Sequence, residues 1–267
     1  MRLIGLILIL STATTHAELL LDEHFFYNDG ILQEVSAGKW TGHSGETNQV
    51  DVTDGGVNLT AKEAQDVNTL LLNAPYLGAN GAVLYAAFKV NFSALPTKTG
   101  SYFAHFKSAS ATGFRGRVWA QLTADKKISI GITSATSSDP VLHPAPLELN
   151  TDHRVVIRLE VGTSLTSLWI DPSTEADASV QSDTGNPLAI TSFALRQASG
   201  IGTLRIDDIV VATTFEELTG RQAGSPVIVR SPAGLTVTAG MPANFSVEAA
   251  GVDRLVYQWF FNNSEIM

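Results

Sequence analysis

Two pairs of adjacent carboxylates are the residues best suited to hold a cation. Asp22 and Glu23 lie near the start of the chain, and Asp207 and Asp208 lie in its second half. Calcium prefers carboxylate and carbonyl oxygens, so the four acids could form one site if the fold brings them together. Alternatively, they are solvated strand ends or accept hydrogen bonds from neighbouring turns. The apolar alternation slips by one position at Asp207 and Asp208, which predicts a β-bulge there.

An aromatic and basic surface is the second candidate site. In 114–121, Phe114, Val118 and Ala120 are expected to face the core, which leaves the intervening residues on the opposite face. If this segment pairs with 102–107, aromatic rings and planar polar donors share one sheet surface, an arrangement suited to a glycan. The predicted ligand-binding residues are Phe103, His105, Arg115, Arg117 and Trp119. The alternative is that the rings pack under a loop and the arginines are solvated.

Motifs for catalysis are missing from the sequence. No Gly-x-Ser-x-Gly elbow, phosphate-binding loop or His-x-x-x-His spacing occurs. The chain has no cysteine, which excludes disulfides, thiolate metal sites and cysteine catalysis. Glycoside hydrolysis needs two carboxylates flanking the bond, and the Asp207–Asp208 pair could supply them only through the bulge. A hydrolase within this chain is therefore the weakest hypothesis.

Composition indicates a packed, acidic protein. The 267 residues are 44% hydrophobic and 16% charged, with a net charge of −9. Nucleic acids and anionic membranes are bound by clustered Lys and Arg, so neither is an expected partner. No segment after the N-terminus is long and apolar enough to cross a membrane.

The first 17 residues are typical of a secretory signal peptide. Arg2 precedes an apolar run from Leu3 to Leu10, which is too short to span a bilayer, and a polar stretch then leads to Ala17. Cleavage is expected after Ala17, with Ala13 as the alternative. A secreted or cell-surface protein without cysteine favours a bacterial source.

Alternation at period two predicts an all-β fold of many short strands. Residues 155–161 and 165–170, separated by Gly162-Thr-Ser, read as a hairpin. The segment 83–90 is apolar on both faces, so we expect it to be covered on both sides. Further strands are expected at 56–60, 69–72, 101–107, 114–123, 127–132, 191–196 and 202–213, with a helical turn at 216–221.

Residues 18–218 resemble a bacterial concanavalin A-like, laminin-G-type jelly roll. The resemblance is carried by structural motifs such as Tyr102-Phe-Ala-His-Phe and Ile206-Asp-Asp-Ile-Val-Val, at 19–25, 102–106, 114–120, 153–160, 168–172 and 206–211. It implies a two-sheet sandwich. It also implies that one calcium ion could join the first and last strands, which would bring Asp22 or Glu23 towards Asp207 or Asp208.

After a polar linker at 219–225, residues 226–267 resemble the N-terminal part of an immunoglobulin-like domain. Trp259 matches the tryptophan at the centre of such sandwiches, and Val247 stands where antibody-type domains carry a cysteine. About seven strands are needed for the complete fold. We therefore expect this domain to be incomplete, with further immunoglobulin-like repeats downstream.

These features favour a non-catalytic, secreted module of a larger protein. Its jelly roll would bind a glycan or cell-surface ligand, or act as a spacer. The alternative is the N-terminal accessory region of an extracellular enzyme, such as a hydrolase, whose catalytic domain lies beyond Met267.

Overall fold

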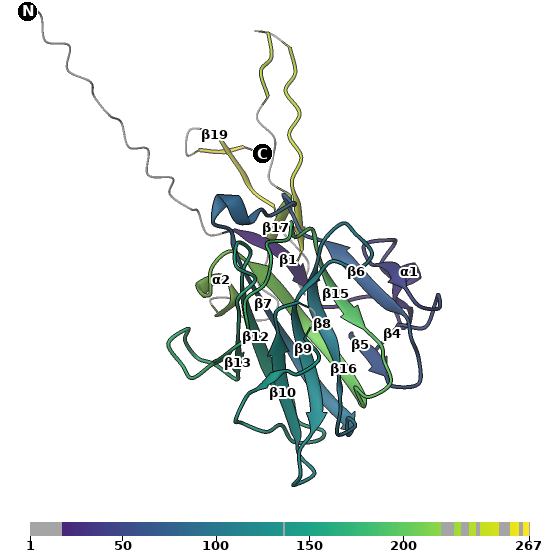
Figure 1. Cartoon of the computed structure of the whole chain (residues 1–267). Helices are drawn as coiled ribbons and strands as arrows, with labels where there is room; N and C mark the ends of the chain where they lie inside the picture. The colour runs from purple at the N-terminus through teal and green to yellow at the C-terminus, as the bar shows by residue number, and fades with distance from the viewer. Residues whose placement is uncertain are drawn as a thin grey trace, which may run out of the picture.

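The computed structural model describes residues 18–135, 137–219, 227–230, 235–238, 241–250, 257–261 and 264–266. Residues 18–219 form two antiparallel sheets packed face to face (Figure 1). The expected all-β jelly-roll sandwich is confirmed. The predicted signal peptide, 1–17, lies outside the described residues, as does most of the 219–225 linker.

The first sheet has nine strands. In spatial order they are β14 (Val180–Gln181), β13 (Thr166–Ile170), β12 (His153–Glu160), β7 (Val83–Ala94), β16 (Thr203–Ala212), β5 (Gly56–Thr60), β4 (Asp51–Thr53) and β2 (Gly30–Ile31), with β1 (Leu19–Glu23) also paired to β16. The predicted hairpin is the β12–β13 pair, in which Val155 lies opposite Ile170.

The second sheet has seven strands. Their order is β11 (Val141–Leu142), β10 (Ile128–Thr133), β9 (Phe114–Leu122), β8 (Ser101–Lys107), β15 (Ser192–Arg196), β6 (Asp66–Leu70) and β3 (Thr41–Ser44). The short helices α1 (Leu32–Val35), η1 (Gly78–Asn80) and α2 (Glu216–Thr219) lie outside the sheets.

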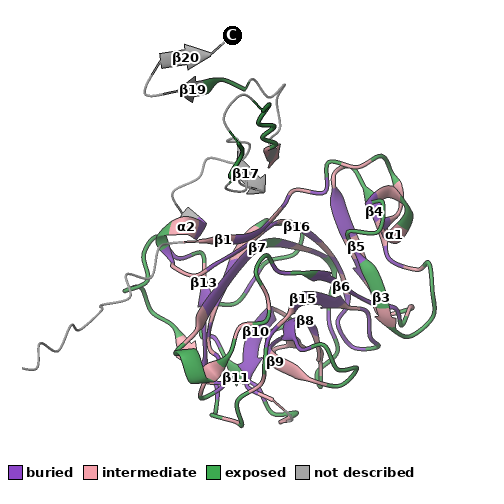
Figure 2. Ribbon diagram, turned by 90° about the horizontal axis from the view of Figure 1, so that it is seen from above, coloured by how far each residue is buried: buried purple, intermediate pink, exposed green. Residues whose placement is uncertain are grey.

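The main core fills the space between the two sheets, where buried residues line both layers (Figure 2). Its centre is aromatic: the rings of Phe88 and Phe92 on β7 each lie 6.1 Å from the ring of Phe103 on β8. Alternating strand residues supply this layer because successive side chains point to opposite faces of a sheet. Burying a full aromatic side chain stabilises the fold by about 1.5–3 kcal/mol.

A second, smaller apolar cluster covers the outer face of the first sheet. Tyr85 and Trp169 lie beneath Phe215 and Leu218, which follow β16, and all four are buried. The Phe215 ring lies 6.3 Å from Tyr85 and 6.1 Å from Trp169. The expectation that 83–90 is covered on both sides is therefore confirmed.

The C-terminal region is described in pieces. Strand β17 (Val227–Arg230) pairs with β18 (Glu248–Ala250), and β19 (Trp259–Phe261) pairs with β20 (Ser264–Ile266). Trp259 is 37% exposed. The resemblance of this region to an immunoglobulin-like domain stays a prediction. No helix in the described parts of the chain is long and apolar enough to cross a membrane.

Candidate ligand-binding site

A bulge in β8 decides which aromatic residue reaches the outer face of the second sheet. Tyr102 lies opposite Trp119 and Ala104 opposite Val118, so Phe103 is an extra residue between two consecutive pairs. Such an insertion reverses the alternation locally. The prediction that Phe103 lies on the ligand face is wrong: it is fully buried in the main core, and Tyr102 takes the outer position.

Strand β9 is also irregular, and this moves Arg115 away from the predicted ligand face. Gly116 adopts a positive φ of 59°, a conformation that favours glycine, and the β8–β9 register shifts there. Arg115 therefore pairs with Phe106 and donates hydrogen bonds to Ser164 Oγ at 2.8 Å and to the Asn186 carbonyl at 2.7 Å. The prediction that Arg115 shares a face with Arg117 and Trp119 is wrong.

Phe114 was also predicted on the wrong face of the second sheet. It was expected in the core, but its ring lies 4.4 Å from His105 and 6.2 Å from His43, both outside the core cluster. The outer surface of the second sheet is thus richer in aromatic rings than the sequence indicated. We call this surface the polar face; it comprises His43, Asp66, Tyr102, His105, Lys107, Phe114, Arg117, Trp119 and Arg196.

Tyr102 is the centre of the polar face. Two guanidinium groups lie over its ring, Arg196 at 4.3 Å and Arg117 at 5.0 Å from the centroid. Both distances are within the range of cation–π attraction. Trp119 lies 5.6 Å from Tyr102, and its indole N–H donates to Thr133 Oγ at 3.0 Å. Trp119 is buried, so Tyr102 is the more accessible ring.

His105 is fully buried below these rings. Burial lowers its pKa to about 3, so the imidazole is neutral and carries one proton. The Nδ1 atom lies 3.1 Å from the Phe106 carbonyl, which can only accept, so the proton belongs on Nδ1. The Nε2 atom is then a buried acceptor, and no described residue donates to it.

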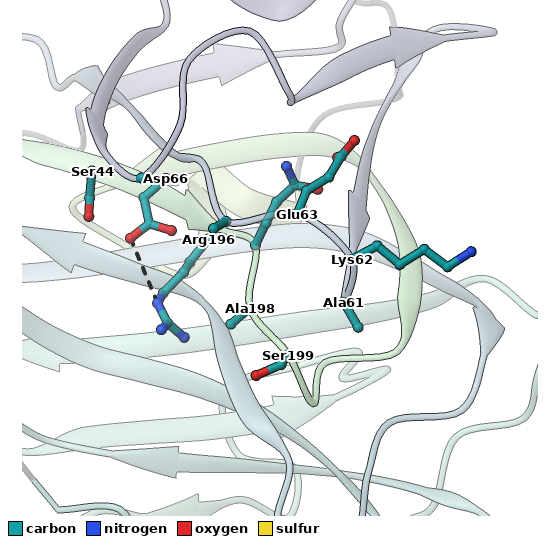
Figure 3. A pocket seen from close by; sticks show the side chains of 11 residues that line it. Ser44, Ala61, Lys62, Glu63, Asp66, Arg196, Ala198 and Ser199 are labelled. Atoms are coloured by element: carbon teal, nitrogen blue, oxygen red, sulfur yellow. Dashed lines mark ion pairs between the residues drawn. The ribbon is translucent and has the colours of Figure 1, made fainter.

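Asp66 and Arg196 form one wall of a pocket at the β6–β15 edge of the polar face. The pocket has a volume of about 460 Å³, and Ser44, Lys62 and Ser199 also line it. Figure 3 shows Asp66 and Arg196 facing one another, with Arg196 Nε 3.7 Å from Asp66 Oδ2. Burial raises the pKa of Asp66 to about 6, although Arg196 opposes the shift. Its Oδ1 atom has no hydrogen-bond partner among the described residues.

Sequence reasoning missed Tyr102, Asp66 and Arg196, but a signal existed for the last. In 192–196, Phe193 and Leu195 are apolar and alternate with Ser192, Ala194 and Arg196, which places Arg196 on the outer face. Asp66 lay outside the predicted strand, which began three residues later.

The four carboxylates predicted to bind calcium do not form one donor set. Strand β1 does pair with β16, and the predicted bulge is present, with Asp208 at a φ of 50°. Asp22 and Asp208 converge, but on the His24 ring: Nε2 lies 3.0 Å from Asp22 Oδ1, and Nδ1 lies 2.6 Å from Asp208 Oδ1. Lys89 Nζ lies 2.5 Å from the other Asp208 oxygen.

These contacts put protein cations where a calcium ion was expected. Hydrogen bonds to Asp208 and then Asp22 raise the pKa of His24 to about 10, so the ring is an imidazolium at neutral pH. His24 and Lys89 in turn lower the pKa of Asp208 to about 2. A metal ion at this point would have to displace a protein cation.

The other two predicted ligands face different partners. Glu23 is 4% exposed and accepts hydrogen bonds from Tyr27 Oη at 2.9 Å and Trp40 Nε1 at 3.0 Å. Asp207 accepts a hydrogen bond from the Asp208 backbone N–H at 2.7 Å. In the described residues, no group of three or more histidine or carboxylate side chains is placed to hold a metal ion.

No family model and no curated protein matches the chain. Among solved structures, it is similar to the T. cruzi calreticulin globular domain, at 14% identity and a TM-score of 0.45, over 76% of this chain and 91% of that one. It is also similar to the CBM2 module of Lactobacillus casei BL23 phage J-1 evolved Dit, at 9% identity and a TM-score of 0.47, over 74% and 96%. Alginate lyase AlgAT5 from polysaccharide lyase family 7 matches at 11% identity and a TM-score of 0.45, over 74% and 94%. These similarities are distant and concern the fold alone.

Proposed function

We propose that this protein is a non-catalytic binding module that holds a glycan on its polar face. The observation that carries the proposal is the stack of Arg196 and Arg117 on the Tyr102 ring, beside the pocket lined by Asp66 and Arg196. Ligand sites typically combine apolar or aromatic walls with a few converging polar groups. Sugar rings offer both an apolar face and hydroxyl groups.

The unpartnered polar atoms support a ligand rather than a purely structural cluster. A buried acceptor without a donor costs about 1–3 kcal/mol, and Asp66 Oδ1 and His105 Nε2 both lack one among the described residues. Asp66 also lines the pocket, so a sugar hydroxyl that enters the pocket could donate to the Asp66 carboxylate. The paired ion groups around His24 offer no comparable unsatisfied atoms.

A glycan-array screen of the purified chain, with calcium and with a chelator, tests the proposal. We expect binding in both conditions, because protein cations balance the carboxylates near β1 and β16. Binding only with calcium would instead restore the calcium prediction. Absence of binding in both conditions would refute the glycan role, and release of sugar products would refute the non-catalytic part.

We also propose that the protein acts outside the cell. The basis is the N-terminal sequence, in which Arg2 precedes the apolar run from Leu3 to Leu10 and Ala17 ends the polar stretch. N-terminal sequencing of the protein recovered from the native host is the test. A mature chain that begins at Glu18 would support secretion, and an intact Met1 would oppose it.

A further inference from the structure

The polar face carries more positive than negative charge, although the whole chain has a net charge of −9. Lys107, Arg117 and Arg196 lie on this face together with one acid, Asp66, and the adjoining pocket adds one charge of each sign, Lys62 and Glu63. Lys107 is 5% exposed and Arg117 is 8% exposed. Lys and Arg are rarely buried this far unless a charge partner compensates them.

No carboxylate of the described residues forms an ion pair with Lys107 or Arg117. Lys107 Nζ donates to the Ser108 carbonyl at 2.9 Å, and an Arg117 terminal nitrogen donates to the Ser137 carbonyl at 2.6 Å. Burial lowers the pKa of both side chains. For Arg117, repulsion from Arg196 adds to this effect on the pKa, while Tyr102 and the charge of Asp183 oppose it. Arg117 Nε has no hydrogen-bond acceptor in the described part of the chain.

From these groups we infer that the glycan bound by the polar face is acidic. Its carboxylate or sulfate group is held by Arg117 and Arg196 over the Tyr102 ring, and one of its hydroxyls donates to the Asp66 carboxylate in the pocket. An anion at this point would relieve the repulsion between the two guanidinium groups, and arginine forms strong charge-assisted hydrogen bonds with both kinds of oxyanion. The inference rests on the proposed glycan-binding function and adds the chemistry of the ligand.

The test is affinity electrophoresis of the whole chain through gels that contain polygalacturonate, dextran sulfate or neutral dextran. We expect retardation by one or both acidic polymers and none by dextran. Retardation by polygalacturonate alone would assign the anion as a carboxylate, and retardation by dextran sulfate alone would assign it as a sulfate.

Arginine variants then separate a specific site from general attraction. Arg196→Gln and Arg117→Gln should each weaken binding about tenfold or more, because each removes a charge-assisted contact. The matched control is Arg205→Gln on β16 of the first sheet, whose loss of one charge should leave binding within about twofold. Because Arg117 is buried, its variant can lose binding by failing to fold, so Arg196→Lys is a second probe. This variant keeps the charge, loses the planar fork and should bind with intermediate strength.

The outcomes that overturn the inference differ from those that overturn the proposed function. Equal loss of binding in Arg205→Gln and Arg196→Gln would show non-specific attraction and refute the acidic site. Binding of neutral glycans on the array, with no retardation by either acidic polymer, would also refute it but leave the glycan function standing. No binding to any glycan would refute both.

Discussion

The two sheets differ in whether the chain's own residues cover and pair the groups on their outer faces. On the first sheet, Phe215 and Leu218 cover Tyr85 and Trp169, and the nearby charges of Asp22, His24 and Asp208 are paired with one another. On the second sheet, three buried atoms of the polar face, Asp66 Oδ1, His105 Nε2 and Arg117 Nε, have no hydrogen-bond partner among the described residues. The same sandwich thus has one face closed by its own chain and one face left chemically incomplete. This contrast is why we propose the second face as the binding site.

The largest expected effect comes from uncovering the first sheet. Phe215→Ala should lower the free energy of unfolding by about 3–5 kcal/mol, because a buried aromatic ring leaves a cavity between Tyr85 and Trp169. Urea denaturation is the measurement. Phe26→Ala is the control, since Phe26 is 59% exposed and should change stability by about 0.5 kcal/mol or less. Equal changes in the free energy of unfolding in the two variants would mean that Phe215 does not cover the outer face of the first sheet.

Breaking the charge cluster of the first sheet should have the next largest effect. His24→Gln should cost about 1–3 kcal/mol at pH 6, because two hydrogen bonds to carboxylates are lost. The folded pKa of about 10 exceeds the ordinary 6.5, so this contribution is complete below about pH 6.5 and disappears as the pH rises through 10.

Unfolding curves at pH 6 and pH 10.5 test this window. The difference between wild type and His24→Gln should shrink at the higher pH. His153→Gln is a suitable control, because His153 pairs with the more exposed Asp171 and should cost less than about 1 kcal/mol. A pH-independent difference for His24→Gln would show that the ring acts through packing alone.

On the polar face, removing a charge should stabilise the protein instead of destabilising it. Asp66→Asn should stabilise the protein by about 1–2 kcal/mol at pH 7. The pKa of Asp66 in the folded protein is about 6 against an ordinary 3.8, so the folded state binds more protons in this range and stability falls as the pH rises from about 4 to 6.

The asparagine variant lacks this titration, so its advantage should vanish below about pH 4. Thermal unfolding across pH 3.5–7.5 measures it. Asp139→Asn, at an exposed position, should stay within about 0.5 kcal/mol of wild type throughout. Destabilisation by Asp66→Asn at pH 7 would indicate that the Asp66 charge stabilises the folded protein, and that the carboxylate is not an unsatisfied acceptor for a ligand.

The smallest effect is expected at Arg115. Arg115→Gln should leave glycan binding unchanged and lower stability by about 1 kcal/mol, because its hydrogen bonds go to Ser164 and the Asn186 carbonyl. Parallel binding and unfolding measurements with Arg117→Gln provide the comparison. Equal loss of binding in both variants would show that Arg115 belongs to the binding site, as the sequence predicted.

Much of the sandwich could be predicted from alternation, and the errors share one cause. The β12–β13 hairpin, the strand from Gly56 to Thr60 and the bulge at Asp208 all follow from period two and its interruptions. Phe103 and Arg115 were misplaced because each adjoins a one-residue bulge, and a single insertion moves neighbouring side chains to the other face.

The bulges of β8 and β9 are harder to detect in the hydrophobic pattern of the sequence than the bulge at Asp208. Around Phe103 and Phe114, aromatic residues occur on both faces, so apolar character alone could not fix the phase. The convergence of Asp66, Tyr102 and Arg196 also depends on the strand order β8–β15–β6, which joins segments far apart in the chain. Local pattern contains no information on that order.

Amide hydrogen exchange of the whole chain, with and without polygalacturonate, tests the central claim most directly. We expect slower exchange in β8, β9 and β15, with β12 and β13 of the first sheet unchanged. Slower exchange confined to the first sheet, or no change in a sample whose binding is saturated, would contradict the assignment of the polar face as the binding site.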